Sequence, residues 1–392
     1  MKKKVLFVLI NMNIGGTEKA LLNMIHEMEK DIYEITIFML EEYGGFLEYI
    51  PEGVRIQYFN NYKKIKDVLN HPPHLIALDY LKKGNFIKAF NIAFYHLLSK
   101  VLRERTRYFN YILNSYPDLE EEFDIAVAYD GPMDFISYFV LNRIKAKKKI
   151  QWIHFDITKI GFNTNFAAKT YKKFDKVFVV SKEAKKNLDS VVPSIKNKTE
   201  VFYNIISPKL VLSSVKAGKG FDDKYDGFRV LTVGRLSIEK GQDIGIRVLK
   251  RLIQDGFKAK WYCIGGGKLK EEYQSLVNKY GLQENFIFLG TDPNPYSYIE
   301  QCDIYVQPSR HEGYCIALAE ARCLCKPIVT TNFAGAREQI NNGETGLIVE
   351  VDEDEIYKAI VSLLRSRNLR NKLSKNLKKE KFETNTDLLN HF

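Results

Sequence analysis

The chain has 392 residues, of which 45% are apolar, and it carries 59 Lys and Arg against 48 Asp and Glu, a formal net charge of +11. This length predicts two domains, and the apolar fraction excludes a largely disordered chain, a collagen and a small disulfide scaffold. The basic charge alone would suit nucleic acid, but the sequence has no zinc finger and no sheet-borne RNA-binding motif. We therefore predict no nucleic-acid partner.

The chain opens on three lysines and an apolar run, Val5 to Ile10. The run is too short for a secretory signal and no small-residue cleavage site follows it, so it predicts a buried first strand. Uninterrupted apolar stretches of about 18 residues do not occur, which excludes a membrane-spanning helix and leaves a soluble or surface-bound protein. The five cysteines include no Cys-x-x-Cys pair, which indicates reduced thiols in a cytoplasmic protein.

Short β-branched or aromatic runs alternate with helical patterns, which is typical of βαβ units and a parallel sheet. We expect two doubly wound, Rossmann-like α/β domains, residues 1–208 and 209–370, facing each other across a cleft where ligands bind. A polar stretch, residues 215–227, precedes the first expected strand of the second domain. Strands are expected at 4–10, 34–40, 125–129, 149–154 and 176–180, and then at 229–233, 260–264, 286–289, 303–306, 327–330 and 346–349.

Residues 61–116 break this alternation. They hold ten Lys and Arg against three Asp and Glu, interleaved with Tyr and Phe, and so supply +7 of the net charge. The pattern predicts two or three amphipathic helices inserted between strands of the first domain. Cationic helices with aromatic anchors bind anionic membrane surfaces, and we expect this insertion to do so. The alternative is a solvated, Lys-rich face of helices that pack on the domain.

A glycine pair, Gly15-Gly16, follows the first expected strand and precedes a helix expected over 18–28. Glycines let the backbone approach a ligand closely, and a helix N-terminus presents unpaired N–H groups to an anion. An ordinary tight turn capped by Thr17 explains the same residues equally well.

A second loop, Gly234-Arg235 to Lys240-Gly241, again joins a strand to a helix. Arg offers a planar fork and Lys a point charge, the two cations that suit a diphosphate. The alternative is a surface ion pair with Glu239.

The third motif runs from Gln307 to Ala321 and includes Glu312 at a loop tip and Glu320 in a helix that is expected to begin near Tyr314. Two carboxylates at this spacing can accept hydrogen bonds from separate hydroxyls of one extended ligand. Glu320 could instead be solvated, but its neighbours are Leu and Ala, a setting in which an unpaired carboxylate is costly.

Together these motifs resemble glycosyltransferase family 4, retaining enzymes of the GT-B fold that use nucleotide-activated sugars, and in particular its members that build bacterial envelope or capsular polysaccharide. The resemblance is dense over residues 229–350 and thinner before residue 208. The chain departs from the family at Tyr314-Cys315, where an aromatic residue followed by Gly is usual. We expect this difference to alter the shape of the sugar pocket but not the fold. Further matching segments are Ile264-Gly265-Gly266-Gly267, Phe288-Leu289-Gly290, Ala334-Gly335-Ala336-Arg337-Glu338 and Gln151-Trp152-Ile153-His154.

The resemblance implies a role for each matched position. Arg235 and Lys240 would bind the donor diphosphate and stabilise the departing nucleotide, while Glu312 and His154 would act at the sugar, and these four are the expected catalytic residues. As an isolated observation, His154 would rather be a structural histidine. The expected donor-binding residues are Gly16, Gly234, Gly313, Tyr314, Cys315, Ile316 and Glu320, the last at the ribose.

The resemblance also implies that residues 371–392 form a helix that crosses back to the first domain. We predict no metal site and no cofactor, because the histidines form no metal-ligand set and two cations supply the charge that a divalent ion would.

We therefore expect a cytoplasmic enzyme at the inner face of the plasma membrane. It would transfer a hexose from a UDP- or GDP-linked sugar to a hydroxyl of a glycan or lipid-linked glycan, with retention of configuration. Asp130 and Asp156 stay open as nucleophiles, and same-face attack, with the leaving phosphate taking the acceptor proton, is favoured. The alternatives are a nucleotide-sugar epimerase of the same fold and a non-catalytic partner subunit that binds the nucleotide sugar.

Overall fold

The computed structural model describes residues 2–103, 105–116, 118–380, 389–390 and 392. By its internal contacts the chain forms two units. Unit 1 contains Met1–Asn13, Met28–Phe202 and His391–Phe392, and unit 2 contains Ile14–Glu27 and Tyr203–Asn390.

Unit 1 is built on a sheet of seven parallel strands in the order β3-β2-β1-β4-β5-β6-β7. The apolar run Val5 to Leu9 of β1 is fully buried in the middle of this sheet, as predicted for the first strand. Helices α6 (Asp134–Arg143), α7 (Thr164–Thr170) and α8 (Lys182–Val191) follow β4, β5 and β6. The strands are β1 (Lys3–Leu9), β2 (Tyr33–Met39), β3 (Arg55–Tyr58), β4 (Glu122–Gly131), β5 (Lys145–Ile153), β6 (Lys176–Val179) and β7 (Thr199–Val201).

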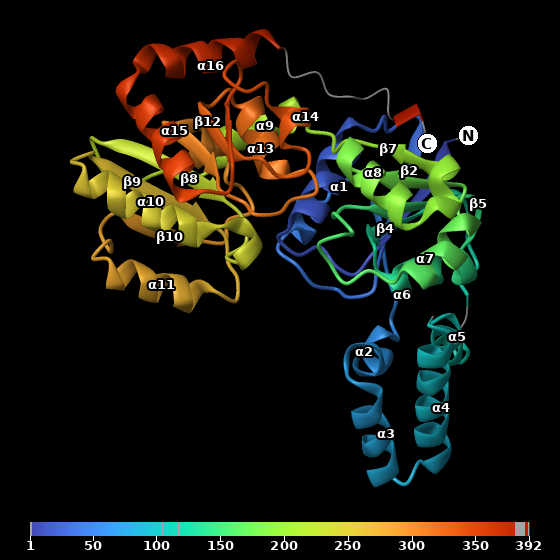
Figure 1. Cartoon of the computed structure of the whole chain (residues 1–392). Coiled ribbons are helices and arrows are strands. Elements are labelled where there is room, and N and C mark those ends of the chain that lie inside the picture. The colour runs from blue at the N-terminus through green and yellow to red at the C-terminus, as the bar shows by residue number, and fades with distance from the viewer. Residues whose placement is uncertain (1, 104, 117, 381–388, 391) are drawn as a thin grey trace. The chain divides into compact units, whose positions relative to one another are not determined.

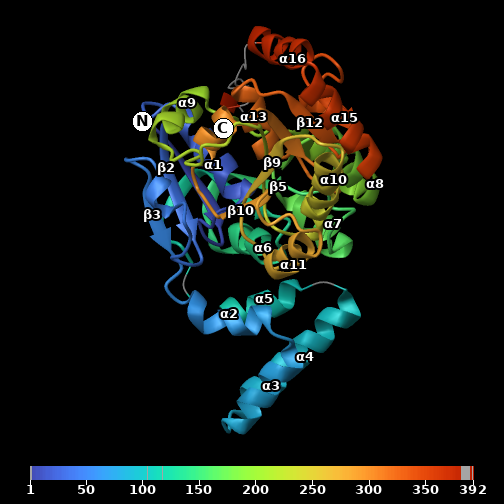
Figure 2. The ribbon, with the colours of Figure 1, turned by 90° about the vertical axis from the view of Figure 1, so that its left-hand side faces the viewer.

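The insertion between β3 and β4 forms four helices rather than two or three: α2 (Tyr62–Asn70), α3 (Pro73–Lys82), α4 (Phe86–Leu102) and α5 (Thr106–Leu113). Helices α2 and α5 join the core of unit 1 through buried side chains such as Ile65 and Phe109. Helices α3 and α4 pack against each other, and in Figure 1 and Figure 2 this pair extends away from the strands of the unit.

Unit 2 is built on six parallel strands in the order β10-β9-β8-β11-β12-β13. The predicted strands of the second half are all confirmed, within one or two residues: β8 (Phe228–Val233), β9 (Ala259–Ile264), β10 (Phe286–Gly290), β11 (Ile304–Gln307), β12 (Ile328–Thr331) and β13 (Leu347–Val349). The helices are α1 (Gly16–Glu27), α9 (Pro208–Ala217), α10 (Gln242–Gln254), α11 (Lys270–Lys279), α12 (Tyr296–Gln301), α13 (Ile316–Cys323), α14 (Ala336–Gln339), α15 (Glu353–Arg365) and α16 (Arg367–Lys379).

The structure differs from the sequence-based domain division at α1. Residues 14–27 were expected in the first domain, but they group with unit 2 because α1 packs on α13 and on residues after Phe202. Strands β3 and β7 were not predicted, since both are short and β3 carries no buried residue.

The expected helix over 371–392 lies partly outside the described residues. Its first part belongs to α16, which buries Leu373 and Leu377 in unit 2, whereas residues 381–388 are not described. Phe392 packs in unit 1 against Phe7, Trp152 and Phe202. Across the described ranges, none of the helices is both long and apolar enough to cross a membrane.

Candidate active site

The candidate site of unit 2 lies where the order of strands reverses. Strands β8 and β11 are neighbours at this switch point, and the loops at their carboxyl ends, 234–241 and 307–315, meet there, as ligand sites of open α/β sheets do. Gly241 makes the approach possible. It has a positive φ of 70°, and a Cβ at this position would stand 2.0 Å from the carbonyl oxygen of Pro308.

An ion pair joins the two loops. Lys240 Nζ donates to Glu312 Oε1 at 2.6 Å, and their side chains are 20% and 9% exposed. Burial works to lower the pKa of Lys240, but the carboxylate of Glu312 more than offsets this, so the pKa is raised. The ammonium therefore stays charged, and its partner is Glu312 rather than the Glu239 of the alternative interpretation.

A chain of hydrogen bonds along β11 fixes Glu312 from behind. The hydroxyl of Tyr305 donates to Gln307 Oε1 at 2.6 Å, the amide of Gln307 donates to Ser309 Oγ at 2.8 Å, and Ser309 Oγ donates to Glu312 Oε1 at 2.8 Å. The side chains of Tyr305 and Gln307 share one side of β11 because side chains alternate with period two along a strand, and Ser309 follows two residues after the strand ends. The carboxylate is thus held in place before any ligand binds.

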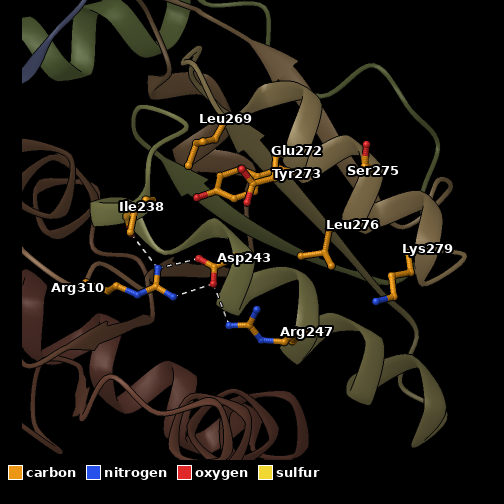
Figure 3. A pocket seen from close by; sticks show the side chains of 10 residues that line it. All are labelled: Ile238, Asp243, Arg247, Leu269, Glu272, Tyr273, Ser275, Leu276, Lys279 and Arg310. Atoms are coloured by element: carbon orange, nitrogen blue, oxygen red, sulfur yellow. Dashed lines mark hydrogen bonds and ion pairs between the residues drawn. The ribbon is translucent and has the colours of Figure 1, made fainter.

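Arg310 fastens the same loop from its outer side. Its guanidinium makes two hydrogen bonds of 2.7 Å to Asp243, which also pairs with Arg247. Figure 3 shows this network at one side of a pocket of about 440 Å³, whose other side is formed by residues of α11 such as Tyr273. The pocket contains neither Lys240 nor Glu312 in its lining, so it is not the candidate site.

Cys315 stands directly before α13 in a left-handed conformation, with φ 64°. Residues other than Gly and Asn rarely adopt this backbone conformation, so the backbone is strained at Cys315. The thiol is buried, which together with Glu312 raises its pKa. Helix α13 begins at Ile316 rather than near Tyr314, which places Glu320 about one turn into the helix instead of two.

Glu320 is buried, with an exposed fraction of 2%. Its Oε1 accepts a hydrogen bond of 2.8 Å from the hydroxyl of Tyr296. Burial raises the pKa of Glu320, while the charge of Lys19 and the bond from Tyr296 act in the opposite direction. The side chain is buried and has a hydrogen-bond partner, so the alternative of a solvated Glu320 is wrong.

Lys19 of α1 supplies the positive charge near Glu320. The side chain is 8% exposed, Nζ donates to the carbonyl oxygen of Pro293 at 2.9 Å, and it stands 4.4 Å from the ring centroid of Tyr296. Burial lowers the pKa of Lys19, and Glu320 and Asp292 oppose that shift.

Two further contacts hold α1 in unit 2. Asn23 Oδ1 accepts a hydrogen bond of 2.9 Å from the backbone N–H of Ser207. Gly16, the first residue of α1, lies close to the start of α13, because a Cβ added there would be 3.7 Å from Ile316 Cγ2. The glycine pair is thereby brought beside the segment from Gly313 to Ile316.

His154 lies in unit 1, directly after β5. Its imidazole packs against Tyr129 and Trp152, with ring centroids 4.5 and 5.8 Å apart. Burial lowers the pKa of His154 to about 3, and the backbone of Tyr129 offsets only part of this effect. The ring is therefore neutral at physiological pH.

Asp130 and Asp156, the two nucleophile candidates, also lie in unit 1. Asp130 accepts a hydrogen bond of 3.2 Å from the backbone N–H of Ile10, and burial raises its pKa. Asp156 Oδ1 accepts hydrogen bonds from the backbone and hydroxyl of Thr158 and from Asn187. Both carboxylates have structural partners.

Unit 2 thus brings together most of the predicted site residues: Gly16, Gly234, Arg235, Lys240, Glu312, Gly313, Tyr314, Cys315, Ile316 and Glu320. Arg235 is exposed beside the ion pair, and Gly234 lies under Lys240, whose Cδ would be 3.4 Å from an added Cβ. The predictions missed Lys19, Tyr296 and the chain from Tyr305 to Ser309. In the part of the chain that is described, no three His, Cys, Asp or Glu side chains gather closely enough to hold a metal ion.

The chain is similar in sequence and in fold to known glycosyltransferases. Residues 220–380 match the family model described as glycosyl transferases group 1. A Campylobacter jejuni protein, N-acetylgalactosamine-N,N'-diacetylbacillosaminyl-diphospho-undecaprenol 4-alpha-N-acetylgalactosaminyltransferase, is 32% identical over 202 residues, which are 50% of this chain and 53% of that protein. The chain thus matches about half the length of this relative. An uncharacterized glycosyltransferase of Haemophilus influenzae is 23% identical over 376 residues, 94% of this chain and 92% of its own.

Among solved structures, Alr3699/HepE of Anabaena in complex with UDP-glucose superposes with a TM-score of 0.71 at 17% identity, covering 99% of this chain and 98% of that one. At this identity the similarity establishes the fold. The protein has the GT-B fold of two Rossmann-like units, and its unit 2 carries the glycosyl transferases group 1 match.

Proposed function

We propose that the protein is a retaining, metal-independent glycosyltransferase that moves a hexosyl group from a nucleotide diphosphate sugar, UDP- or GDP-linked, to a hydroxyl of a glycan or lipid-linked glycan. The observation that carries this proposal is the Lys240–Glu312 ion pair of 2.6 Å at the switch point of unit 2. A fixed cation and a fixed carboxylate at this edge suit the two ends of such a donor, its diphosphate and its sugar.

The charges of the site fit departure of a nucleoside diphosphate. Lys240 stays protonated because Glu312 raises its pKa, and the guanidinium of the exposed Arg235 is permanently charged. Negative charge develops on the leaving phosphate as the glycosidic bond breaks. Preorganised cations at that point stabilise the transition state, the task that a divalent ion performs in other enzymes.

Glu312 and Glu320 would hold the rest of the donor. The bond from Ser309 and the pair with Lys240 fix the orientation of Glu312, so that it can accept hydrogen bonds from sugar hydroxyls. Glu320, buried near Lys19 and bonded by Tyr296, suits the ribose hydroxyls.

The state of the two aspartates argues against a double displacement, one of the two routes to retention. A double displacement needs a carboxylate that is free to attack the anomeric carbon, but Asp130 and Asp156 are engaged by backbone and side-chain donors. We therefore propose same-face attack, in which the leaving phosphate oxygen takes the acceptor proton. The name of the Campylobacter relative specifies an alpha linkage, which an α-linked donor gives with retention.

The acceptor is proposed to be lipid-linked, at the cytoplasmic face of the plasma membrane, with the segment 61–116 bound to the anionic lipid surface. The name of the Campylobacter relative includes a diphospho-undecaprenol-linked sugar, and the +7 charge of this segment suits anionic headgroups.

Donor binding tests the proposal most simply. In a panel of nucleotide sugars, one at a hundred times its dissociation constant should stabilise the wild type by about 2.7 kcal/mol in thermal unfolding. Lys240→Ala and Arg235→Ala should lose most of this gain, because each removes a cation from the diphosphate. Lys216→Ala, an exposed lysine of α9, is the control and should keep it. Equal stabilisation of all four proteins would contradict the assignment.

A further inference from the structure

Large apolar side chains gather on the outside of the α3–α4 pair. Among the described residues, nine of the 21 exposed large apolar side chains lie between residues 75 and 101. Their exposed fractions run from 44% at Leu81 to 76% at Ile87. We call this set the apolar stripe: Leu75, Leu78, Leu81, Phe86, Ile87, Phe90, Phe94, Leu97 and Val101.

On each helix the stripe forms a face and is not a scatter of exposed residues. At about 100° per residue, the six members on α4, from Phe86 to Val101, fall within an arc of roughly 100°. The three members on α3 follow one another at spacings of three. Rings within the stripe also touch, since Phe90 and Phe94 stack with centroids 6.1 Å apart.

The opposite face of the pair is already occupied. Ala77, Ala89 and Ile92 are buried where α3 and α4 meet, and Tyr95 stacks on Tyr111 of α5 at 4.8 Å. The hairpin is therefore correctly packed on its inner side, and the stripe is not a core that awaits rearrangement. Contiguous exposed apolar faces of this kind mark interaction surfaces.

The charges around the stripe favour an anionic bilayer over a second copy of the chain as its partner. Residues 73–103 carry five basic side chains, Lys82, Lys83, Lys88, Lys100 and Arg103, against one acidic side chain, Asp79. A second copy of the chain would bring the same positive charges together around the contact. An anionic bilayer offers hydrocarbon to the stripe and negative headgroups to the long cationic side chains.

We infer that the α3–α4 hairpin inserts its apolar stripe below the headgroups of an anionic bilayer and so anchors the protein by hydrocarbon contact as well as by charge. Helix α4 lies in the plane of the interface, with its phenyl rings at the level of the upper acyl chains. The inference deepens the proposed function, since a lipid-linked acceptor is presented at that surface, but the anchoring itself requires neither donor nor acceptor.

Co-sedimentation with vesicles of equal parts phosphatidylglycerol and phosphatidylcholine tests the anchor. The triple variant Phe86→Ser, Ile87→Ser, Phe90→Ser should lower the partition coefficient at least tenfold, because three inserting side chains become polar. The matched control is the triple variant Ile32→Ser, Leu212→Ser, Val351→Ser, whose sites are 43%, 56% and 41% exposed outside the hairpin and which should bind like the wild type. Circular dichroism of both variants checks that they fold.

A fluorescence measurement distinguishes insertion from adsorption. Trp152 and Trp261 are buried at 1% exposure, so a Phe90→Trp variant adds a signal of its own. Its emission should shift to the blue on vesicles and be quenched by lipids brominated on the acyl chain. Both effects should persist at high salt, which weakens adsorption by charge alone. No shift and no quenching, or binding by the Ser variant equal to that of the wild type, would overturn the inference. So would a wild-type dimer that the Ser variant converts to monomer while vesicle binding is unchanged, since the stripe would then join two copies.

The outcome is independent of catalysis. Transfer to a short, water-soluble acceptor should be the same in the wild type and in the stripe variant, because the three substitutions leave every residue of the candidate site unchanged. If such transfer is absent in both while vesicle binding behaves as stated, the proposed function fails and the anchor stands.

Discussion

Lys240 and Glu312 stand 72 residues apart in the chain and meet only because β8 and β11 are neighbours in the sheet. Their residue types and loop positions were predictable from the sequence, since Gly-flanked cations and a carboxylate follow recognisable strands. Their pairing with each other was not, because it depends on strand order. The hydrogen bonds from Tyr305 through Ser309 were difficult to predict, because only Tyr305 and Gln307 lie in the short strand β11 and two residues are too few to show a period of two.

Cys315 could not be understood from the sequence alone. The left-handed backbone at this position, φ 64°, is a property of the turn into α13, and it normally favours glycine. The departure from the family pattern at Tyr314-Cys315 is thus also a place where the backbone is strained.

The buried imidazole of His154 makes the stability of unit 1 depend on pH. Its pKa is about 3 in the folded state and about 6.5 when unfolded, so below pH 6.5 the unfolded state binds more protons and stability falls as pH falls. Relative to His154→Asn, the wild type should lose about 1.7 kcal/mol of unfolding free energy between pH 6.5 and 5, since the slope rises from half to nearly all of 1.4 kcal/mol per pH unit over this interval. Urea unfolding at the two pH values measures this.

The exposed His311 provides the control for this measurement. His311→Asn should follow the wild type at both pH values. A constant difference between the wild type and His154→Asn across the range would mean that the imidazole is not shielded from protons.

Helix α1 shows how an element can belong to one unit although its sequence neighbours belong to the other. A helix was predicted over 18–28, after the glycine pair, and the structure has one at Gly16–Glu27. Its membership in unit 2 rests on long-range contacts of Lys19 and Asn23, which no local pattern shows.

The contact between α1 and α13 predicts an energetic coupling. Lys19 offsets part of the cost of burying Glu320, so Lys19→Met should destabilise the protein strongly when Glu320 is present and weakly in a Glu320→Gln background. A double-mutant cycle by urea unfolding should give a coupling of about 1 to 3 kcal/mol. Additive effects, as expected for the control pair Lys216→Met with Glu320→Gln, would show that the two charges do not interact.

At the scale of the whole molecule, the alternation of strands and helices sufficed to predict two doubly wound units, and all strands of unit 2 were recognisable. Unit 1 was harder to predict for physical reasons. Its edge strands are short and partly exposed, so they show no hydrophobic periodicity. In addition, an insertion of four helices interrupts the alternation of strands and helices between β3 and β4. That insertion concentrates the net charge, +7 out of +11, and the remainder of the chain is nearly neutral.

The central claim is that unit 2 binds a nucleotide diphosphate sugar and that its cations drive the transfer. Acceptor-dependent release of nucleoside diphosphate, measured with the donor that stabilises the wild type, tests it directly. Lys240→Ala should reduce the turnover number by about a hundredfold to a thousandfold, since it removes one preorganised charge from the leaving group, while Lys216→Ala should turn over like the wild type. Turnover by a folded Lys240→Ala variant within a few fold of the wild type would contradict the account.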